Sequence, residues 1–131
     1  MRHWRVVIVF LLLVLTACNN ALDPNLKTAR AFLDSYYVMA NQQAALPLTS
    51  GHATETINQE IALLAGVEAR DDSYKSRDMN FKLIESQTVG SDANYFYELT
   101  ITQPGLGKMT KHVSIIVDPT TQKVKDFRTV D

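Results

Sequence analysis

The sequence predicts an α+β domain in which two N-terminal helices pack on a four-stranded antiparallel meander sheet. Two patterns predict this class. Apolar residues recur at helical spacing in the first half of the chain, and from Met79 onward they alternate with polar residues as in strands. Short turn sequences separate the strand-like segments, which favours antiparallel neighbours. The apolar face of such a sheet needs cover, and the two preceding helices are the elements that can supply it.

The first helix is predicted over residues 24–44. Asp23 suits the N-cap because its carboxylate accepts hydrogen bonds from the first free N–H groups, and Pro24 suits the first helical position. Pro47 ends this helix, because proline disfavours helical backbone in the residue before it. Its apolar stripe consists of Leu26, Ala29, Leu33, Tyr36, Tyr37, Ala40 and Ala44.

The second helix is predicted over residues 53–65, with Gly66 as its C-terminal cap. Its apolar stripe consists of Ile57, Ile61, Leu64 and Ala65. Charges of both signs follow over residues 68–78, and this stretch is interpreted as either a loop or a short third helix.

The predicted strands occupy the rest of the chain. The first begins at Met79, the second is clearest around residues 95–102, and the others span residues 109–117 and 123–130. The residues expected to face the helices are Tyr95, Tyr97, Val113, Ile115 and Val117. The fourth strand alternates poorly, because Val124 and Phe127 cannot both face the helices without a β-bulge.

The first 18 residues have the pattern of an export signal. Basic residues precede ten apolar residues from Val6 to Leu15, a run too short to cross a bilayer as a helix but of the length of a signal-peptide core. The sequence Leu15-Thr16-Ala17-Cys18 resembles the lipobox of bacterial lipoproteins. The resemblance implies a diacylglycerol on the Cys18 thiol, cleavage before it and acylation of the new N-terminus. The alternative is an uncleaved anchor with an incidental cysteine.

This interpretation divides the chain into a cleaved signal peptide (1–17), a lipidated N-terminus with a tether (18–23) and one α+β domain (24–131). Two or more acyl chains hold a protein stably on a membrane, whereas one holds it only marginally. Asn19 stands where, in Gram-negative lipoproteins, an Asp tends to retain the protein in the inner membrane. The resemblance therefore implies an outer-membrane protein that faces the periplasm, given a Gram-negative source.

The order of helices followed by a bent antiparallel sheet resembles the cystatin-like and nuclear-transport-factor-2-like folds. Many small bacterial lipoproteins have such a fold. The resemblance covers about residues 24–130 and rests on element order, size and the hairpin-like ending at residues 117–124. A lipoprotein fold of the outer-membrane assembly type, or a PepSY-like module, would give a similar pattern. No catalytic motif of these families matches, so the resemblance implies no site residues.

Composition excludes several classes of function. The chain has 131 residues, which suits one domain, and its single cysteine excludes a disulfide framework and a cysteine zinc site. The net charge is −1, and all acidic residues follow the signal whereas Arg2 and Arg5 lie in it. This mildly acidic body argues against nucleic acid as a partner. We expect neither a cofactor nor a metal, because the two histidines of the body show no ligand spacing.

Four tyrosines are candidate pocket residues, Tyr36 and Tyr37 on the first helix and Tyr95 and Tyr97 on the covered face of the second strand. In folds of this type, a helix and a bent sheet enclose a conical pocket, and tyrosines suit its wall because they are apolar with a polar tip. His52 is a candidate base near the mouth. The alternative interpretation is core tyrosines and an exposed turn histidine.

A candidate interaction face lies on the other side of the sheet, where Ile84, Phe96 and Ile116 are expected with Phe127 beside them. Contiguous apolar residues on a flat sheet face indicate a partner or dimer surface.

The sequence therefore favours a non-enzymatic, lipid-anchored envelope module that binds a protein or a second copy of itself. The alternative is a small-ligand binding protein or an enzyme that uses the pocket between helices and sheet. Enzymes on such folds usually place an acid or base inside the pocket. Here only Asp34 and Glu60 lie even at the margins of the helix stripes, which disfavours an enzyme.

Cys18→Ala is expected to abolish acylation and signal cleavage, because the modification needs the thiol. Mass analysis of the membrane fraction should then find only the unprocessed precursor. A Cys18→Ala protein that still fractionates with the outer membrane in its mature form would contradict the lipobox interpretation.

Overall fold

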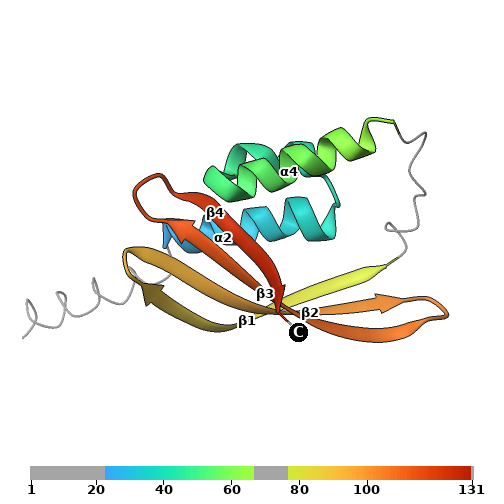
Figure 1. Cartoon of the computed structure of the whole chain (residues 1–131). Coiled ribbons are helices and arrows are strands. Elements are labelled where there is room, and N and C mark those ends of the chain that lie inside the picture. The colour runs from blue at the N-terminus through green and yellow to red at the C-terminus, as the bar shows by residue number, and fades with distance from the viewer. Residues whose placement is uncertain (1–22, 67–76, 131) are drawn as a thin grey trace, which may run out of the picture.

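The computed structural model describes residues 23–66 and 77–130, and it confirms the predicted fold class of helices followed by an antiparallel meander. Figure 1 shows the helices in one layer over one face of a strongly twisted sheet. The strands lie side by side in chain order, each antiparallel to the next. They are β1 (Asp78–Val89), β2 (Asp92–Gln103), β3 (Gly107–Asp118) and β4 (Lys123–Val130).

The first predicted helix is divided into shorter pieces. Asp23 caps α2 as expected, because its Oδ1 accepts from the Asn25 N–H at 3.0 Å. The chain leaves the helical path at Ala40, whose φ of 48° lies in the left-handed region, so the prediction of one helix over 24–44 is wrong in its second half. The pieces are α2 (Pro24–Leu33), the π-helix η2 (Asp34–Val38), α3 (Gln42–Ala45) and the 3₁₀ turn η3 (Leu46–Leu48).

The second long helix, α4 (Gly51–Leu64), begins two residues before the predicted start. The charged stretch that was interpreted as a loop or a third helix lies mostly outside the described residues. In the described part of the chain, no helix is long and apolar enough to cross a membrane.

The core lies between α2, α4 and the covered face of the sheet. The five strand residues expected to face the helices are all buried, which confirms the predicted alternation of β2 and β3. Full burial of one such side chain stabilises a fold by about 1.5–3 kcal/mol. The largest buried side chains are Phe32, Leu33, Ile57, Tyr97, Leu99, Val113, Ile115, Val117 and Val124.

A β-bulge in β4 reverses the expected orientation of Phe127. Ile116 pairs with Asp126 but Val117 pairs with Val124, so Lys125 is an extra residue in the ladder. Val124 and Phe127 therefore both face the helices. The Phe127 ring lies 4.8 Å from those of Phe32 and Tyr36. The expectation that Phe127 belongs to the outer face is wrong, because the bulge shifts the alternation by one residue.

The outer face of the sheet retains Ile84, Phe96 and Ile116. Phe96 and Ile116 are half-buried, and Ile84 is 52% exposed at a second bulge, between Leu83 and Glu85. The surrounding residues on this face are mostly polar. They include the contacts of His112 with Glu98 at 3.6 Å and of Arg128 with Asp126 at 3.5 Å.

Phe127→Ala is expected to lower the free energy of unfolding by about 2–4 kcal/mol, because it removes the ring between the helical layer and the sheet. Phe96→Ala is the matched control, since the same truncation on the outer face should cost about 1 kcal/mol. Urea unfolding followed by circular dichroism measures both losses. Equal losses would contradict the assignment of the two rings to opposite faces.

Candidate functional site

Two cavities lie between the helical layer and the covered face of the sheet. The first, which we call the basic cavity, has a volume of about 180 Å³. Its lining consists of Tyr36, Tyr37, Arg77, Met79, Leu99, Ile101, Lys111, Val113 and Thr129. The second, which we call the hydroxyl cavity, has a volume of about 280 Å³. Its lining consists of Asp23, Asn25, Ser86, Gln87, Thr88, Ser91, Ala93, Tyr95 and Pro119.

The π-helix η2 builds one wall of the basic cavity. A π-turn widens the helix locally, a feature that recurs at functional sites. It brings Tyr36 and Tyr37 together, with ring centroids 4.8 Å apart and nearly perpendicular. Tyr36 also stacks on Phe32 at 5.3 Å and contacts Phe127, so its ring is held from three sides. The aromatic wall is therefore preformed.

Glu60 of α4 lies behind this wall. The Tyr36 hydroxyl donates to Glu60 Oε1 at 2.6 Å, whereas Glu60 Oε2 is buried and finds no partner among the described residues. Burial raises the pKa of Tyr36 most, and the hydrogen bond to this carboxylate raises it further. Burial likewise raises the pKa of Tyr37 to about 12, although a hydrogen bond with Thr129 acts in the opposite direction. Both phenols therefore stay neutral at physiological pH.

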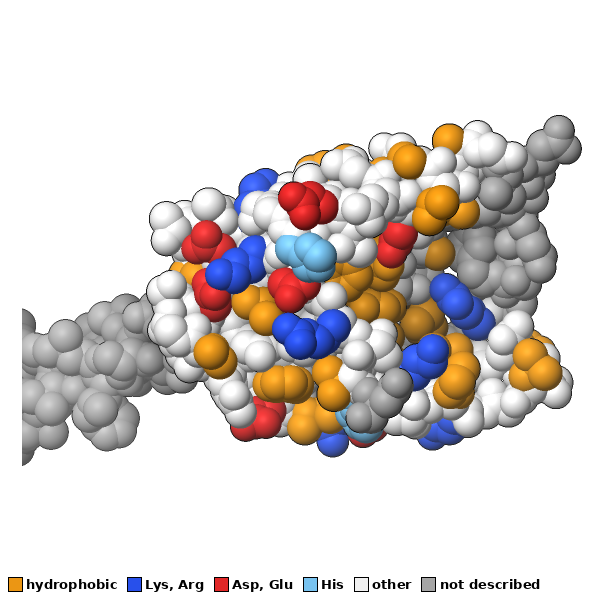
Figure 2. All heavy atoms as spheres, in the orientation of Figure 1, with side chains coloured by type: hydrophobic (Ala, Val, Ile, Leu, Met, Phe, Trp, Pro, Cys, Tyr) orange, Lys and Arg blue, Asp and Glu red, His pale blue; other side chains and the backbone are white. Residues whose placement is uncertain are grey.

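Two basic residues complete the lining. Arg77 precedes β1 and donates from Nη2 to the Tyr37 carbonyl oxygen at 3.2 Å, while its Nε is buried without a partner among the described residues. Lys111 of β3 is exposed at the edge of the cavity. Within residues 23–66 and 77–130, no acidic side chain forms an ion pair with either one. In Figure 2, hydrophobic side chains are visible between the helical layer and the sheet, with basic side chains beside them.

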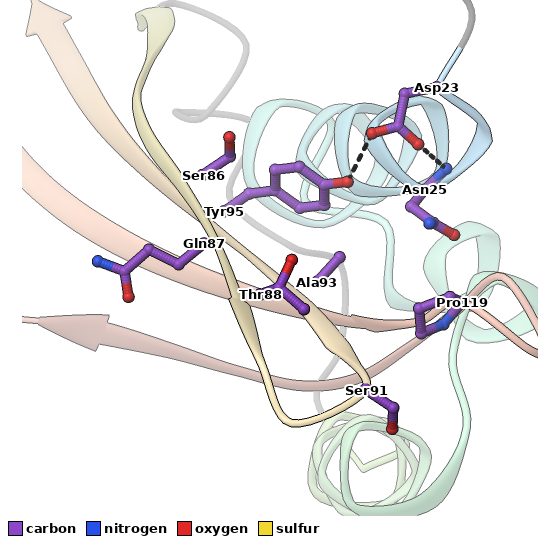
Figure 3. A pocket seen from close by; sticks show the side chains of 9 residues that line it. All are labelled: Asp23, Asn25, Ser86, Gln87, Thr88, Ser91, Ala93, Tyr95 and Pro119. Atoms are coloured by element: carbon purple, nitrogen blue, oxygen red, sulfur yellow. Dashed lines mark hydrogen bonds between the residues drawn. The ribbon is translucent and has the colours of Figure 1, made fainter.

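The hydroxyl cavity has a different chemistry. Figure 3 shows Tyr95 reaching from β2 toward Asp23, whose Oδ2 accepts from the Tyr95 hydroxyl at 2.9 Å. The other carboxylate oxygen caps α2 through the Asn25 N–H. Asp23 is the one charged side chain among the described residues of this lining, and both of its carboxylate oxygens already accept hydrogen bonds from the protein itself. A ligand in this cavity would therefore meet hydroxyl and amide groups of the protein rather than a free charge.

The structure separates the candidate pocket residues. Tyr36 and Tyr37 line the basic cavity and Tyr95 lines the hydroxyl cavity, whereas Tyr97 is buried at 1% exposure. Helix α2 packs across the sheet and fills the space between the two cavities. His52 is exposed at the start of α4, 3.8 Å from Glu55, and lines neither cavity.

The sequence analysis missed Arg77, Lys111, Thr129 and the contact of Glu60 with Tyr36. One of them carried a signal. Lys111 has the same strand parity as Val113, so the alternation that places Val113 under the helices also places Lys111 on the covered face. A lysine at an inward position is unusual unless it lies beside a cavity or a partner. Arg77 and Glu60 carried no comparable signal, because each reaches the cavity region from a separate segment.

Comparisons with protein-family models, curated proteins and solved structures found no match. Among the described residues, no group of three or more His, Cys, Asp or Glu side chains could hold a metal ion.

Stability is expected to fall as the pH rises above about 10. Burial raises the pKa of Tyr37 and of Tyr97 to about 12 in the folded chain, whereas the ordinary tyrosine pKa is 10. Between these two pH values the unfolded chain releases the phenol protons and the folded chain keeps them. This stabilisation is complete below pH 10 and is lost toward pH 12. Tyr37→Phe should therefore flatten the decline by up to about 2 kcal/mol, measured as unfolding free energies from pH 8 to 11.5. Identical slopes for variant and wild type would contradict this prediction.

Proposed function

We propose that this chain is a membrane-anchored, non-enzymatic binding module that holds a small ligand in the basic cavity. The observation that carries the proposal is a combination of three features. They are a preformed aromatic wall, the half-buried apolar side chains of Met79 and Ile101, and two basic groups without ion-pair partners among the described residues. Concave, mostly apolar sites with a few convergent polar groups are the usual form of small-molecule sites.

Binding is favoured over catalysis by the chemistry of the lining. Among the described residues, the nine that line the basic cavity include no carboxylate, imidazole or thiol. The raised pKa values of Tyr36 and Tyr37 make both phenols poor bases near neutral pH, where a general base needs a pKa close to the working pH. The neighbouring Glu60 is engaged with the Tyr36 hydroxyl. These features suit a site that holds a molecule without transforming it.

The membrane anchor in this proposal is a lipid on Cys18, which lies outside the described residues. Export to the outer membrane, with the domain in the periplasm, follows from the lipobox resemblance. Asp23 caps the start of α2, so only a few residues separate this helix from the proposed lipid on Cys18. The cavity would therefore work close to a membrane surface.

Self-association or binding of another envelope protein through the outer sheet face stays a prediction. Because Phe127 faces the helices, the apolar residues expected on the outer face are reduced to Ile84, Phe96 and Ile116. Of these three, only Ile84 is largely exposed. We therefore place the cavity before this face as the functional site. Phe96→Asp is the variant that tests the face.

Native mass spectrometry of the full chain, produced in a bacterium and released gently from membranes, tests the proposal. The lipidated wild type is expected to carry an additional small-molecule mass at one copy per chain. Thr129→Trp should reduce the occupied fraction by about tenfold or more, because an indole at this cavity position fills the space that the ligand needs. Thr129 lies near the end of an edge strand and is itself exposed, so the variant should fold.

Phe96→Asp, on the outer face, is the control for cavity binding and should keep the small-molecule mass. A wild type without any additional mass, or equal occupancy in wild type and Thr129→Trp, would overturn the proposal. A dimer that dissociates in Phe96→Asp would support the outer face instead.

A further inference from the structure

We infer that the ligand of the basic cavity is a small organic anion, namely a carboxylate with a short apolar chain. This inference rests on the proposed function and adds the ligand class. Three observations carry it: the local charge, the donors that remain on the Arg77 guanidinium, and the size and polarity of the remaining lining.

The charge at the cavity favours an anion. Arg77 and Lys111 belong to the lining, and no described acidic side chain pairs with them. Glu60 acts electrostatically on Tyr36 and Tyr37 from behind the aromatic wall. Counted over the described residues of the lining and Glu60, two cations stand against one carboxylate, which leaves a local positive excess. Such an excess attracts an anion, more strongly at the half-buried Arg77 than at the exposed Lys111, where solvent screens the charge.

Arg77 has donor capacity to spare. A guanidinium carries five N–H donors in a planar fork that matches a carboxylate. One donor on Nη2 is used on the Tyr37 carbonyl oxygen, which orients the group, and Nε is buried without a partner among the described residues. Nε is shielded from the cavity as well, so the donors open to a ligand are those that remain on the two Nη atoms. A ligand carboxylate would accept from these donors and pair with the guanidinium charge, whereas a neutral apolar ligand would leave both without a partner.

A short apolar body fits the rest of the lining. Met79 and Ile101 are half-buried and can still contact a ligand, whereas Leu99 and Val113 are already buried. Inorganic phosphate or sulfate would leave the exposed parts of Met79 and Ile101 uncovered. A volume of 180 Å³ holds about six water-sized groups, so the chain is short, near six carbons. The wall hydroxyls are neutral and therefore do not repel a carboxylate.

Calorimetric titration of the full lipidated chain in phospholipid nanodiscs tests the ligand class, with empty nanodiscs as reference. The probes are butyrate, hexanoate, octanoate and 1-hexanol. We expect one hexanoate per chain, and an affinity that rises about fourfold per methylene from butyrate until the cavity is full. Hexanoate should bind at least about tenfold more tightly than 1-hexanol, because the alcohol can accept one hydrogen bond but has neither the charge nor the second acceptor oxygen of the carboxylate.

Arg77→Gln is expected to weaken hexanoate binding by about tenfold or more and to leave 1-hexanol binding unchanged. Arg128→Gln is the matched control, with the same change of charge on the outer face, and should alter neither affinity. Lys111→Gln, at an exposed position, gives a second test if Arg77→Gln fails to fold. It should weaken hexanoate selectively as well.

The outcomes separate the ligand class from the proposed function. Equal affinities for hexanoate and 1-hexanol in the wild type, with no effect of Arg77→Gln or Lys111→Gln, would overturn the carboxylate while leaving a ligand cavity. No binding of any probe would overturn the carboxylate class too. The comparison of wild type and Thr129→Trp by mass spectrometry would then decide whether the cavity binds a ligand of another class.

Discussion

The bulge at Lys125 is the constraint on which the joint between helices and sheet depends. It turns Phe127 toward the helical layer, where the ring contacts Phe32 and Tyr36. Without the extra residue, continued alternation from Val124 would place Asp126 under the helices and Phe127 in solvent. The burial of an aromatic ring is worth several kcal/mol, whereas a bulge disturbs the ladder at one residue. The packing of one ring therefore decides the shape of the edge strand.

The packing of Phe127 against the helices also fixes the aromatic wall of the basic cavity. Phe127 supports Tyr36, and Tyr36 is in turn fixed by its hydrogen bond to Glu60 of α4. Three separate segments thus position one aromatic wall, and a fourth contributes Arg77 through its bond to the Tyr37 carbonyl. The hydroxyl cavity differs because its carboxylate closes the structure on itself. In the hydroxyl cavity the carboxylate is used fully by the fold, whereas in the basic cavity Arg77 and Lys111 form no ion pair with any described acidic side chain.

Much of the fold could be predicted from the sequence because it follows from local patterns. The cap at Asp23 and the alternation of β2 and β3 depend on neighbouring residues only, and both predictions are confirmed. The break near Ala40 could not be predicted, since no glycine marks its left-handed backbone. The bulge of β4 was recognised as one alternative, but which residue it turns inward depends on the partner rings of another element. Only part of the candidate site could be predicted for the same reason. Tyr36 and Tyr37 are neighbours on one helix, whereas Glu60 and Arg77 come close to them only through tertiary packing.

The double use of Asp23 also has a mechanical consequence. A tether of five residues, 18–22, spans at most about 18 Å, so a lipid at Cys18 would transmit the drift of the membrane directly to the first turn of α2. That turn is fastened at two places: Asp23 accepts from Tyr95 on β2, and the Thr28 hydroxyl contacts the Gln122 carbonyl oxygen between β3 and β4. A pull on the tether is therefore shared by two points of the sheet instead of peeling the helix from its end. Given the proposed lipid on Cys18, the start of α2 would spread a load on the chain over two points of the sheet.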